Sequence, residues 1–253
     1  MDTRSSHSPF CFGNVYPVYA HSWSVGPIAP LWSLSIEEQF YIAVPIAFKV
    51  AGKRSLKVIF LITLVVAYTA LAWLGHKGVS AGLTVWANSF VQFQFFAVGG
   101  LCALLLYQSE IALSIPLRGI TAVAGLGAWI IAPTRYDLMG SGSTTRNLLL
   151  GYSILLIGTT MIFIAVLDMK VRVPRPLVYL GKISYGLYLF HQLFIEIVLH
   201  TYSAHLDLRD HPFVAAIVAL SMTIATAALS YHYFERPILK YKQHFETVRT
   251  RPA

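Results

Sequence analysis

The sequence predicts an all-α fold, a polytopic transmembrane helical bundle, and three observations support that prediction. Hydrophobic residues make up 56% of the 253 residues and charged residues only 12%, about half the share of an ordinary soluble domain. The mean hydropathy is +0.62. The apolar residues gather in blocks of about 17 to 25 residues, long enough for a helix to cross a hydrocarbon core of ~30 Å. A soluble enzyme with one large core is the disfavoured alternative.

The apolar blocks predict about seven membrane spans. They cover residues 36–52, 56–75, 89–107, 116–132, 146–167, 176–199 and 213–235. Around them we expect three regions: an extracytoplasmic segment over 1–30, the transmembrane domain over 31–240 and a cytoplasmic tail over 241–253.

The Lys and Arg residues predict the orientation of these spans. Of the 19, 14 lie in or beside the connections after the first, third and fifth spans or in the tail, and 5 lie on the other side. Because Lys and Arg concentrate in cytoplasmic connections, the N-terminus is predicted outside and the C-terminus inside. The net charge of +8 then belongs to membrane topology and not to nucleic acid. Residues 1–30 show no signal peptide, so an outside N-terminus predicts an N-terminally truncated chain.

No metal site is predicted. Cys11 and Cys102 are far apart in the chain, and no cluster of His, Cys, Asp and Glu has the spacing of metal ligands. A Gly-rich phosphate loop and a GxSxG nucleophile motif are also absent from the sequence.

The stretch LWSLSIEEQFYIAVP, residues 31–45, places two adjacent carboxylates, Glu37 and Glu38, at the mouth of the first predicted span. One interpretation is structural: Ser35 as N-cap with Glu38 three positions later forms a capping box, and acids in a first turn complement the helix dipole. The two carboxylates lie ~100° apart around a helix. Only one is needed as a cap, so the other is free to face a cavity.

His191 lies near the middle of the sixth predicted span. An ionisable side chain at that depth is by default a functional candidate that faces the bundle interior. Ser184 and Tyr188 recur with it at helical spacing and predict one polar stripe. The structural alternative is a neutral histidine hydrogen-bonded to a neighbouring helix. Glu196 either pairs with Gln192 at i−4 or approaches the outer surface.

Four short motifs stand in order along the chain. They are LWSLSIEEQFY at 31–41, FQFFAVGG at 93–100, LGKISYGLYLFH at 180–191 and LSYHYFERP at 229–237. They resemble the signatures of the bacterial integral-membrane acyltransferases, acyltransferase family three (O-acetyltransferase type). The resemblance implies a location in the bacterial inner membrane and about ten spans with both ends cytoplasmic. Without the first three of those spans seven remain, and the chain enters the first of the seven from outside.

The resemblance also implies a reaction. An acyl group, usually acetyl, passes from acyl-CoA to a hydroxyl of a cell-surface or exported carbohydrate, with acyl-CoA as donor substrate and no bound cofactor. The family further implies a catalytic histidine in an earlier span, eleven positions after a basic residue. None of the nine histidines here has that spacing. The first alternative is therefore an inactive fragment, or one that depends on a partner or an oligomer for the missing helices.

The candidate catalytic residues are Glu37, Glu38 and His191. The two acids orient the base or position the acceptor, and His191 donates to the oxyanion or holds the polar network of the site. The predicted substrate-binding residues are Trp32, Ser33, Ser35, Gln39, Tyr41, Tyr188 and Arg236. Donor phosphates are expected at inner-face basic residues such as Arg236, and the acceptor near Trp32.

The predicted partners are the lipid bilayer, acyl-CoA and a carbohydrate acceptor. The second alternative is a transporter or channel in which Glu37, His191 and Glu196 form an ion pathway. Against it, the sequence has no inverted repeat and no pair of interrupted helices.

Overall fold

The computed structural model confirms the all-α fold, because the residues that it describes form helices and contain no strand. The described residues are 14, 30–52, 55–78, 82–106, 113–138, 140, 143–169, 172–199 and 212–242. The chain divides into two units, and each is described by itself.

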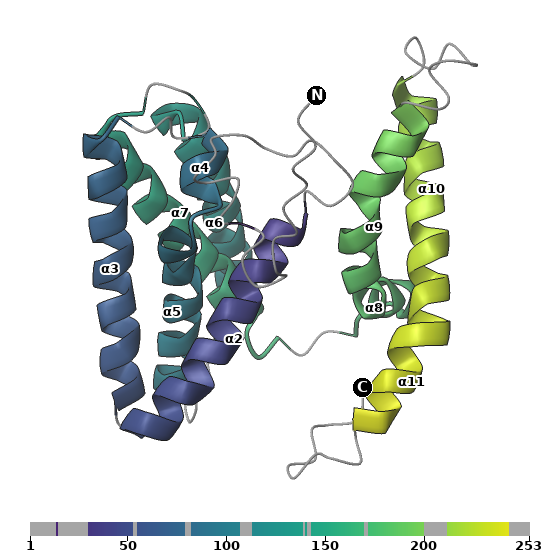
Figure 1. Ribbon diagram of the computed structural model, residues 1–253, viewed down its shortest axis with the longest axis horizontal. Coiled ribbons are helices and arrows are strands. Elements are labelled where there is room, and N and C mark those ends of the chain that lie inside the picture. The colour runs from purple at the N-terminus through teal and green to yellow at the C-terminus, as the bar shows by residue number, and fades with distance from the viewer. Residues whose placement is uncertain are drawn as a thin grey trace, which may run out of the picture. The chain divides into compact units, whose positions relative to one another are not determined.

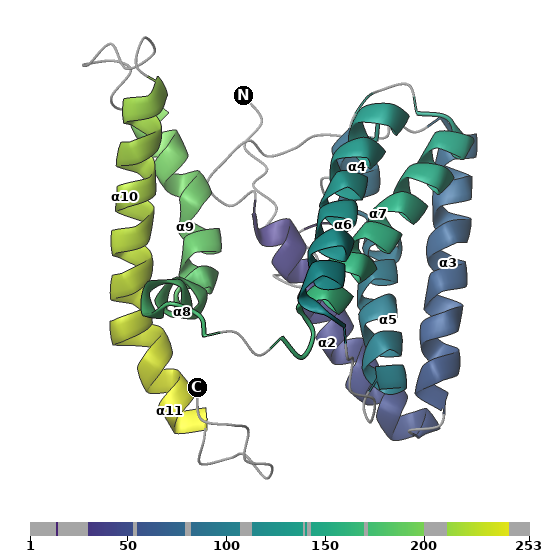
Figure 2. The same cartoon turned by 180° about the vertical axis from the view of Figure 1, so that it is seen from behind.

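The first unit contains the helices α2 to α7, and the second contains α8 to α11. In the first unit the helices are α2 (Leu31–Ala51), α3 (Leu56–His76), α4 (Gly82–Trp86), α5 (Ser89–Leu106), α6 (Ile115–Tyr136) and α7 (Thr145–Val166). In the second they are α8 (Arg175–Lys182), α9 (Ser184–Ile197), α10 (Pro212–Ser230), the π-helix η4 (Tyr231–Glu235) and α11 (Arg236–Lys242). In Figure 1 and the reverse view in Figure 2, α3, α5, α6 and α7 run side by side in the first unit, as do α9 and α10 in the second.

Five stretches of helix are long and apolar enough to cross a membrane. They are Leu56–His76, Ser89–Leu106, Ile115–Tyr136, Thr145–Val166 and Pro212–Tyr241. Large apolar side chains on these helices remain exposed, including Val65 at 64% and Val123 at 69%. In water, an apolar surface of this extent would be unfavourable. Contact with lipid explains it.

The helix α2 begins five residues before the predicted first span, directly after Pro30. Ser35 therefore lies inside the helix, where its Oγ donates to the Leu31 carbonyl at 3.0 Å. No acidic residue lies in the first turn. The capping-box interpretation of Ser35 and Glu38 is wrong, because Leu31–Leu34 add a full turn ahead of them. The polar run Glu37–Gln39 lowers the hydropathy of α2, which explains why this helix is not among the five apolar stretches.

The sixth predicted span, 176–199, is divided into two helices. Ile183, at φ −94° and ψ 6°, separates α8 from α9, and these dihedrals lie in the bridge region between helix and strand. The 14 residues of α9 extend about 21 Å at ~1.5 Å per residue. Helix α9 alone is therefore shorter than the hydrocarbon core.

The last predicted span continues beyond residue 235 but changes its winding. Pro237, the second residue of α11, has no amide hydrogen, and its ring excludes the normal hydrogen bond to the carbonyl of Tyr233. The wider π turn over Tyr231–Glu235 accommodates that loss. Within this turn, Oε1 of Glu235 is buried with no hydrogen-bond partner among the described residues.

Small residues bring the helices of each unit close together. A methyl group added at Gly158 of α7 would come within 2.8 Å of the Ala128 Cβ and 2.9 Å of the Gly125 carbonyl oxygen, both on α6. A methyl group at Gly186 of α9 would come within 3.0 Å of Ala227 on α10. Lipid tails are as apolar as the side chains, so close packing of this kind, and not hydrophobic burial, holds membrane helices together.

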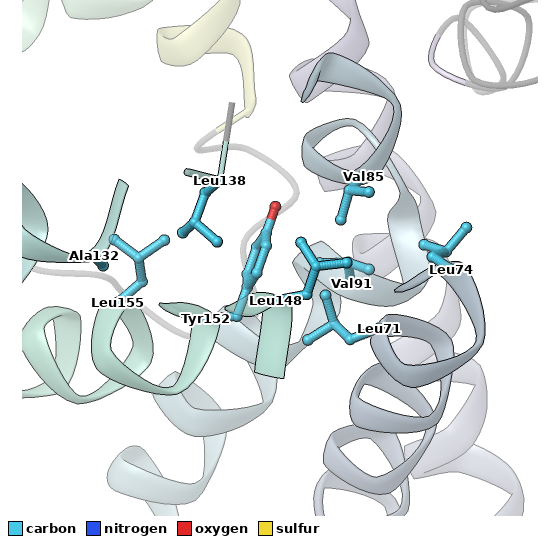
Figure 3. Close-up of a cluster of buried hydrophobic side chains, with 9 residues drawn as sticks. All are labelled: Leu71, Leu74, Val85, Val91, Ala132, Leu138, Leu148, Tyr152 and Leu155. Atoms are coloured by element: carbon cyan, nitrogen blue, oxygen red, sulfur yellow. The ribbon is translucent and has the colours of Figure 1, made fainter. Parts of the chain in front are cut away.

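The main buried cluster of the first unit lies at one end of this packing. Figure 3 shows the ring of Tyr152 with Leu138 on one side and Leu148 on the other. Tyr68 on α3 and Ser153 on α7 are joined by a hydrogen bond of 2.8 Å between their hydroxyls. These contacts hold α3, α5, α6 and α7 as one unit, against which α2 and α4 are placed.

Arg118, in the first turn of α6, is the buried basic residue of this unit among the described residues. One of its terminal nitrogens donates to the carbonyls of Ala165 at 2.9 Å and Leu167 at 2.6 Å, and its Nε donates to Leu113 at 3.1 Å. The two carbonyls at the end of α7 lack partners within that helix. A cation there also complements the negative end of the helix dipole, so Arg118 fixes the α6–α7 pair at that end.

Candidate functional site

A cleft of about 300 Å³ lies within the first unit. It is lined by Trp32, Ser33, Ile36, Glu37, Trp86, Gln92, Phe95, Phe96, Trp129 and Thr159. These residues come from α2, α4, α5, α6 and α7, so helices far apart in the sequence build one site.

Helix α2 contributes the polar side of the cleft. Trp32, Ser33, Ile36 and Glu37 stand at positions i, i+1, i+4 and i+5 and share one face of the helix. Glu37 is the one ionisable residue among the ten that line the cleft. A carboxylate accepts hydrogen bonds and cannot donate them, so the cleft suits a ligand group that carries a hydroxyl or amine hydrogen.

Aromatic rings form most of the remaining wall. Trp32 and Trp86 meet edge to face, with ring centroids 6.5 Å apart. Trp129 donates from Nε1 to the Thr159 hydroxyl at 3.1 Å, which fixes the orientation of its indole. Phe96 stacks on Phe40 of α2 at a centroid distance of 4.7 Å. Flat, immobilised faces of this kind give a ligand contact area with little loss of side-chain entropy.

A polar network adjoins the cleft and joins α2 to the start of α5. The Gln39 amide nitrogen donates to Asn14 Oδ1 at 3.0 Å, and Ser89 Oγ donates to Gln39 Oε1 at 2.6 Å. The Asn14 amide nitrogen donates to the Ala87 carbonyl at 2.9 Å and to Ser89 Oγ at 2.8 Å. Asn14 is 2% exposed. Ala87 directly follows Trp86, so this network positions α2 against a wall of the cleft.

We predict that Asn14→Ala destabilises the protein by about 1–3 kcal/mol, because it removes the hydrogen bonds that Asn14 makes to the buried Ala87 carbonyl and to the half-buried side chains of Gln39 and Ser89. The measurement is the thermal or SDS unfolding midpoint in detergent. Asn147→Ala is the control, since no hydrogen bond from that side chain joins it to the described residues, and we expect a change within about 0.5 kcal/mol. Equal effects of the two substitutions would contradict the prediction.

The other predicted residues of the first motif lie outside the cleft lining. Ser35 is buried and bonded to its own helix, and Gln39 has both ends of its amide engaged in the network. Glu38 is half-buried, one helix position around from Glu37. Tyr41 is 63% exposed on α2. The structure therefore brings Trp32, Ser33 and Glu37 together at one cleft and distributes the rest of the motif around it.

The second unit holds His191, Tyr188 and Arg236. His191 Nδ1 lies 2.6 Å from the Tyr188 carbonyl, and the two rings are 5.6 Å apart. A carbonyl only accepts, so we assign the hydrogen to Nδ1, which leaves the lone pair of a neutral ring on Nε2. Nε2 has no hydrogen-bond partner among the described residues. The Tyr188 hydroxyl donates to the Pro30 carbonyl at 3.0 Å.

The structure also shows the positions of Glu196 and Arg236, two further residues of this unit that the sequence analysis singled out. Gln192 donates to Glu196 over 3.5 Å, a long contact, so the predicted i−4 pair is present and weak. Arg236 is exposed at the first position of α11. No group of three or more His, Cys, Asp or Glu residues suited to a metal ion occurs within the described part of the chain.

Sequence reasoning missed the opposite wall of the cleft. Trp86 lies in the short helix α4, between two predicted spans, and Trp129 and Thr159 lie inside apolar spans where no motif marks them. Gln92 was visible as a polar residue near the start of a span. No local pattern indicates that α4, α5, α6 and α7 converge on α2, because the convergence depends on the crossings between these helices.

The helices and their cleft define a class: a multi-pass membrane protein with an acid held in an aromatic site. Residues 6–232 match the acyltransferase domain family. The chain belongs to this family, acyltransferase family three, and the family predicted from the sequence is confirmed.

The chain is also similar to curated bacterial proteins. It is 22% identical over 233 residues to the O-acetyltransferase OatA of Staphylococcus aureus strain NCTC 8325 / PS 47, and equally to OatA of strain COL. It is 26% identical over 257 residues to SACOL0978 of strain COL. Each alignment covers 88% of this chain and 38% of the relative, so the chain spans less than half the length of these relatives. No solved structure matches it.

Proposed function

We propose that the chain forms the acceptor side of a membrane-bound O-acyltransferase that moves an acyl group from acyl-CoA to a hydroxyl of a cell-surface or exported carbohydrate. The observation that carries the proposal is the cleft, where the motif acid Glu37 is the one ionisable lining residue beside Trp32, Trp86 and Trp129. The carboxylate accepts a hydrogen bond from a sugar hydroxyl. The aromatic faces pack against the apolar faces of a sugar ring.

The reaction sets out what the protein must supply. The acceptor oxygen bonds to the thioester carbonyl carbon, the carbon–sulfur bond breaks, and the hydroxyl proton passes through a base to the departing CoA thiolate. Catalysis requires that base and hydrogen-bond donors for the developing oxyanion. In this proposal Glu37 holds the acceptor hydroxyl and orients it toward the base. The family resemblance assigns the base to an upstream histidine that none of the nine histidines here matches.

His191, a residue of the second unit, is proposed to handle a proton during acyl transfer. With its hydrogen on Nδ1, toward the Tyr188 carbonyl, neutral His191 accepts a proton at Nε2 and donates to an oxyanion only as the imidazolium. Arg236, exposed at the start of α11, is proposed to bind the phosphates of acyl-CoA at the cytoplasmic face. The name of OatA, an O-acetyltransferase, supports acetyl as the acyl group.

The experiment is acyl transfer in proteoliposomes that contain the full chain. Radiolabelled acetyl-CoA is supplied on one side and an oligosaccharide acceptor on the other, and acetylated saccharide is the expected product. A second preparation carries a fused upstream span with the family's basic-residue and histidine motif. Transfer in that preparation alone identifies the chain as the partner-dependent form. No transfer in either, together with ion or solute flux that is independent of acyl-CoA, overturns the proposal in favour of a transporter.

A further inference from the structure

The helix α8 departs from the direction of its neighbours. In Figures 1 and 2, α9 and α10 run lengthwise while α8 is seen close to end-on, so its axis crosses theirs at the end of the pair from which α11 continues. This is the orientation of a helix that lies in the plane of the membrane interface beside helices that cross the bilayer. The division of the sixth predicted span at Ile183 makes this change of direction.

The sequence of α8, RPLVYLGK, is amphipathic at helical spacing. Arg175 and Lys182 are seven positions apart and so lie on the same face. Leu177 and Leu180 lie on the opposite face, and they are 57% and 39% exposed. No residue of α8 is buried. An exposed apolar face opposite a basic face is the pattern of helices that lie at the boundary between headgroups and acyl chains.

Among the described residues, the charged side chains near α8 are basic except for Glu235. Arg172 precedes it, Arg175 and Lys182 belong to it, and α11 adds Arg236 and Lys240 at the same end of the unit. The one carboxylate that the described residues place near this end is Glu235, whose Oε1 is buried. The side chains of Arg175 and Lys182 are exposed and make no hydrogen bond or ion pair with the described residues. They are available to an anionic group outside the protein.

We propose that α8 is an interfacial helix that binds the headgroups of anionic phospholipids through Arg175 and Lys182, with Leu177 and Leu180 inserted among the acyl chains. The bilayer is the occupant that provides both chemistries at the correct level: phosphates for the cations and hydrocarbon for the leucines. Because Ser184 of α9 follows after the single residue Ile183, the bound headgroups set the depth of α9 in the membrane. The proposal is independent of the acyl-transfer activity.

The first test measures lipid selectivity. The full chain is placed in nanodiscs of phosphatidylcholine with increasing phosphatidylglycerol, and the lipid retained after transfer to detergent is counted by native mass spectrometry. We expect selective retention of phosphatidylglycerol, reduced about thirtyfold in Arg175→Gln/Lys182→Gln at low ionic strength, or about fivefold per charge. Arg135→Gln/Arg146→Gln, two exposed cations of the first unit, is the control and should retain the selectivity. Equal retention by all three proteins would refute the role of α8.

The second test measures the position of the apolar face. With both native cysteines replaced, an environment-sensitive fluorophore is attached to a cysteine at Leu180 or at Lys182, and quenching by brominated phosphatidylcholine is compared with quenching by iodide. At Leu180, which faces hydrocarbon in this proposal, we expect brominated lipid to quench the label at least about fivefold more efficiently than iodide does. At Lys182, which faces water, we expect iodide to be the more efficient quencher by the same factor. A label at Leu180 shielded from both quenchers means that protein covers this face, and it overturns the proposal. A label open to iodide overturns it as well.

Discussion

Replacing Glu37 with Gln is expected to lower kcat/KM for acyl transfer by at least about 100-fold, the scale of loss when a reacting group is held out of position. Glutamine preserves the size of the side chain, so the cleft among Trp32, Trp86 and Trp129 keeps its shape. The substitution replaces a charged acceptor with a weaker neutral one and introduces two amide hydrogens toward the acceptor hydroxyl. The measurement is the initial rate of transfer in proteoliposomes.

Glu38→Gln provides the matched control. Glu38 is the adjacent residue of the same helix and motif, but it does not line the cleft, because neighbouring helical residues point ~100° apart. We expect its kcat/KM to stay within about threefold of the unmodified protein. Equal losses from both substitutions would mean that the motif acts as a unit and that the cleft does not distinguish its two acids. Undiminished transfer by Glu37→Gln would remove Glu37 from the mechanism.

The second large effect is expected on stability, at the crossing of α6 and α7. Gly158→Ala should destabilise the protein by about 1–3 kcal/mol, the range for an added group in a well-packed interior. The new methyl group would meet the Ala128 Cβ at 2.8 Å and the Gly125 carbonyl oxygen at 2.9 Å, so the two helices must separate. The measurement is the SDS or thermal unfolding midpoint of the purified protein in detergent.

Gly127→Ala tests the same chemistry on the same pair of helices. A methyl group at Gly127 of α6 meets nothing within 4 Å, so the higher helix propensity of alanine acts alone, and we expect a gain of about 0.5–1 kcal/mol. The two substitutions should thus shift the midpoint in opposite directions. A gain at both positions would show that α6 and α7 are not in close contact at Gly158.

Hydropathy was sufficient to predict the helices, but it did not predict where α2 begins or that the sixth predicted span divides at Ile183. The spans at 56–75, 89–107 and 146–167 correspond to α3, α5 and α7 within one residue at each end, because a lipid environment requires an uninterrupted apolar helix. The prediction was less accurate where polar residues enter the run. At Ser35 a capping signature lay inside a helix, and at Ile183 an apolar run contained a change of direction.

For the candidate site, too, local sequence predicted one part and the fold determined the other. The four motifs carry the family and point to Glu37 as a residue of interest, because they are local in the sequence. They do not indicate that Trp129 of α6 and Thr159 of α7 complete the cleft around it, or that Asn14 holds α2 in place through Gln39.

By itself, the sequence determined that this chain is a bundle of membrane helices and a member of an acyltransferase family, since both properties depend on runs of neighbouring residues. The tertiary structure alone decided which face of α2 meets the cleft, which aromatic rings surround Glu37, and that α8 lies across its neighbours. Those outcomes depend on where helices cross. The crossings are decided by contacts such as Gly125 with Gly158, between residues that are distant in the chain and carry no pattern in common.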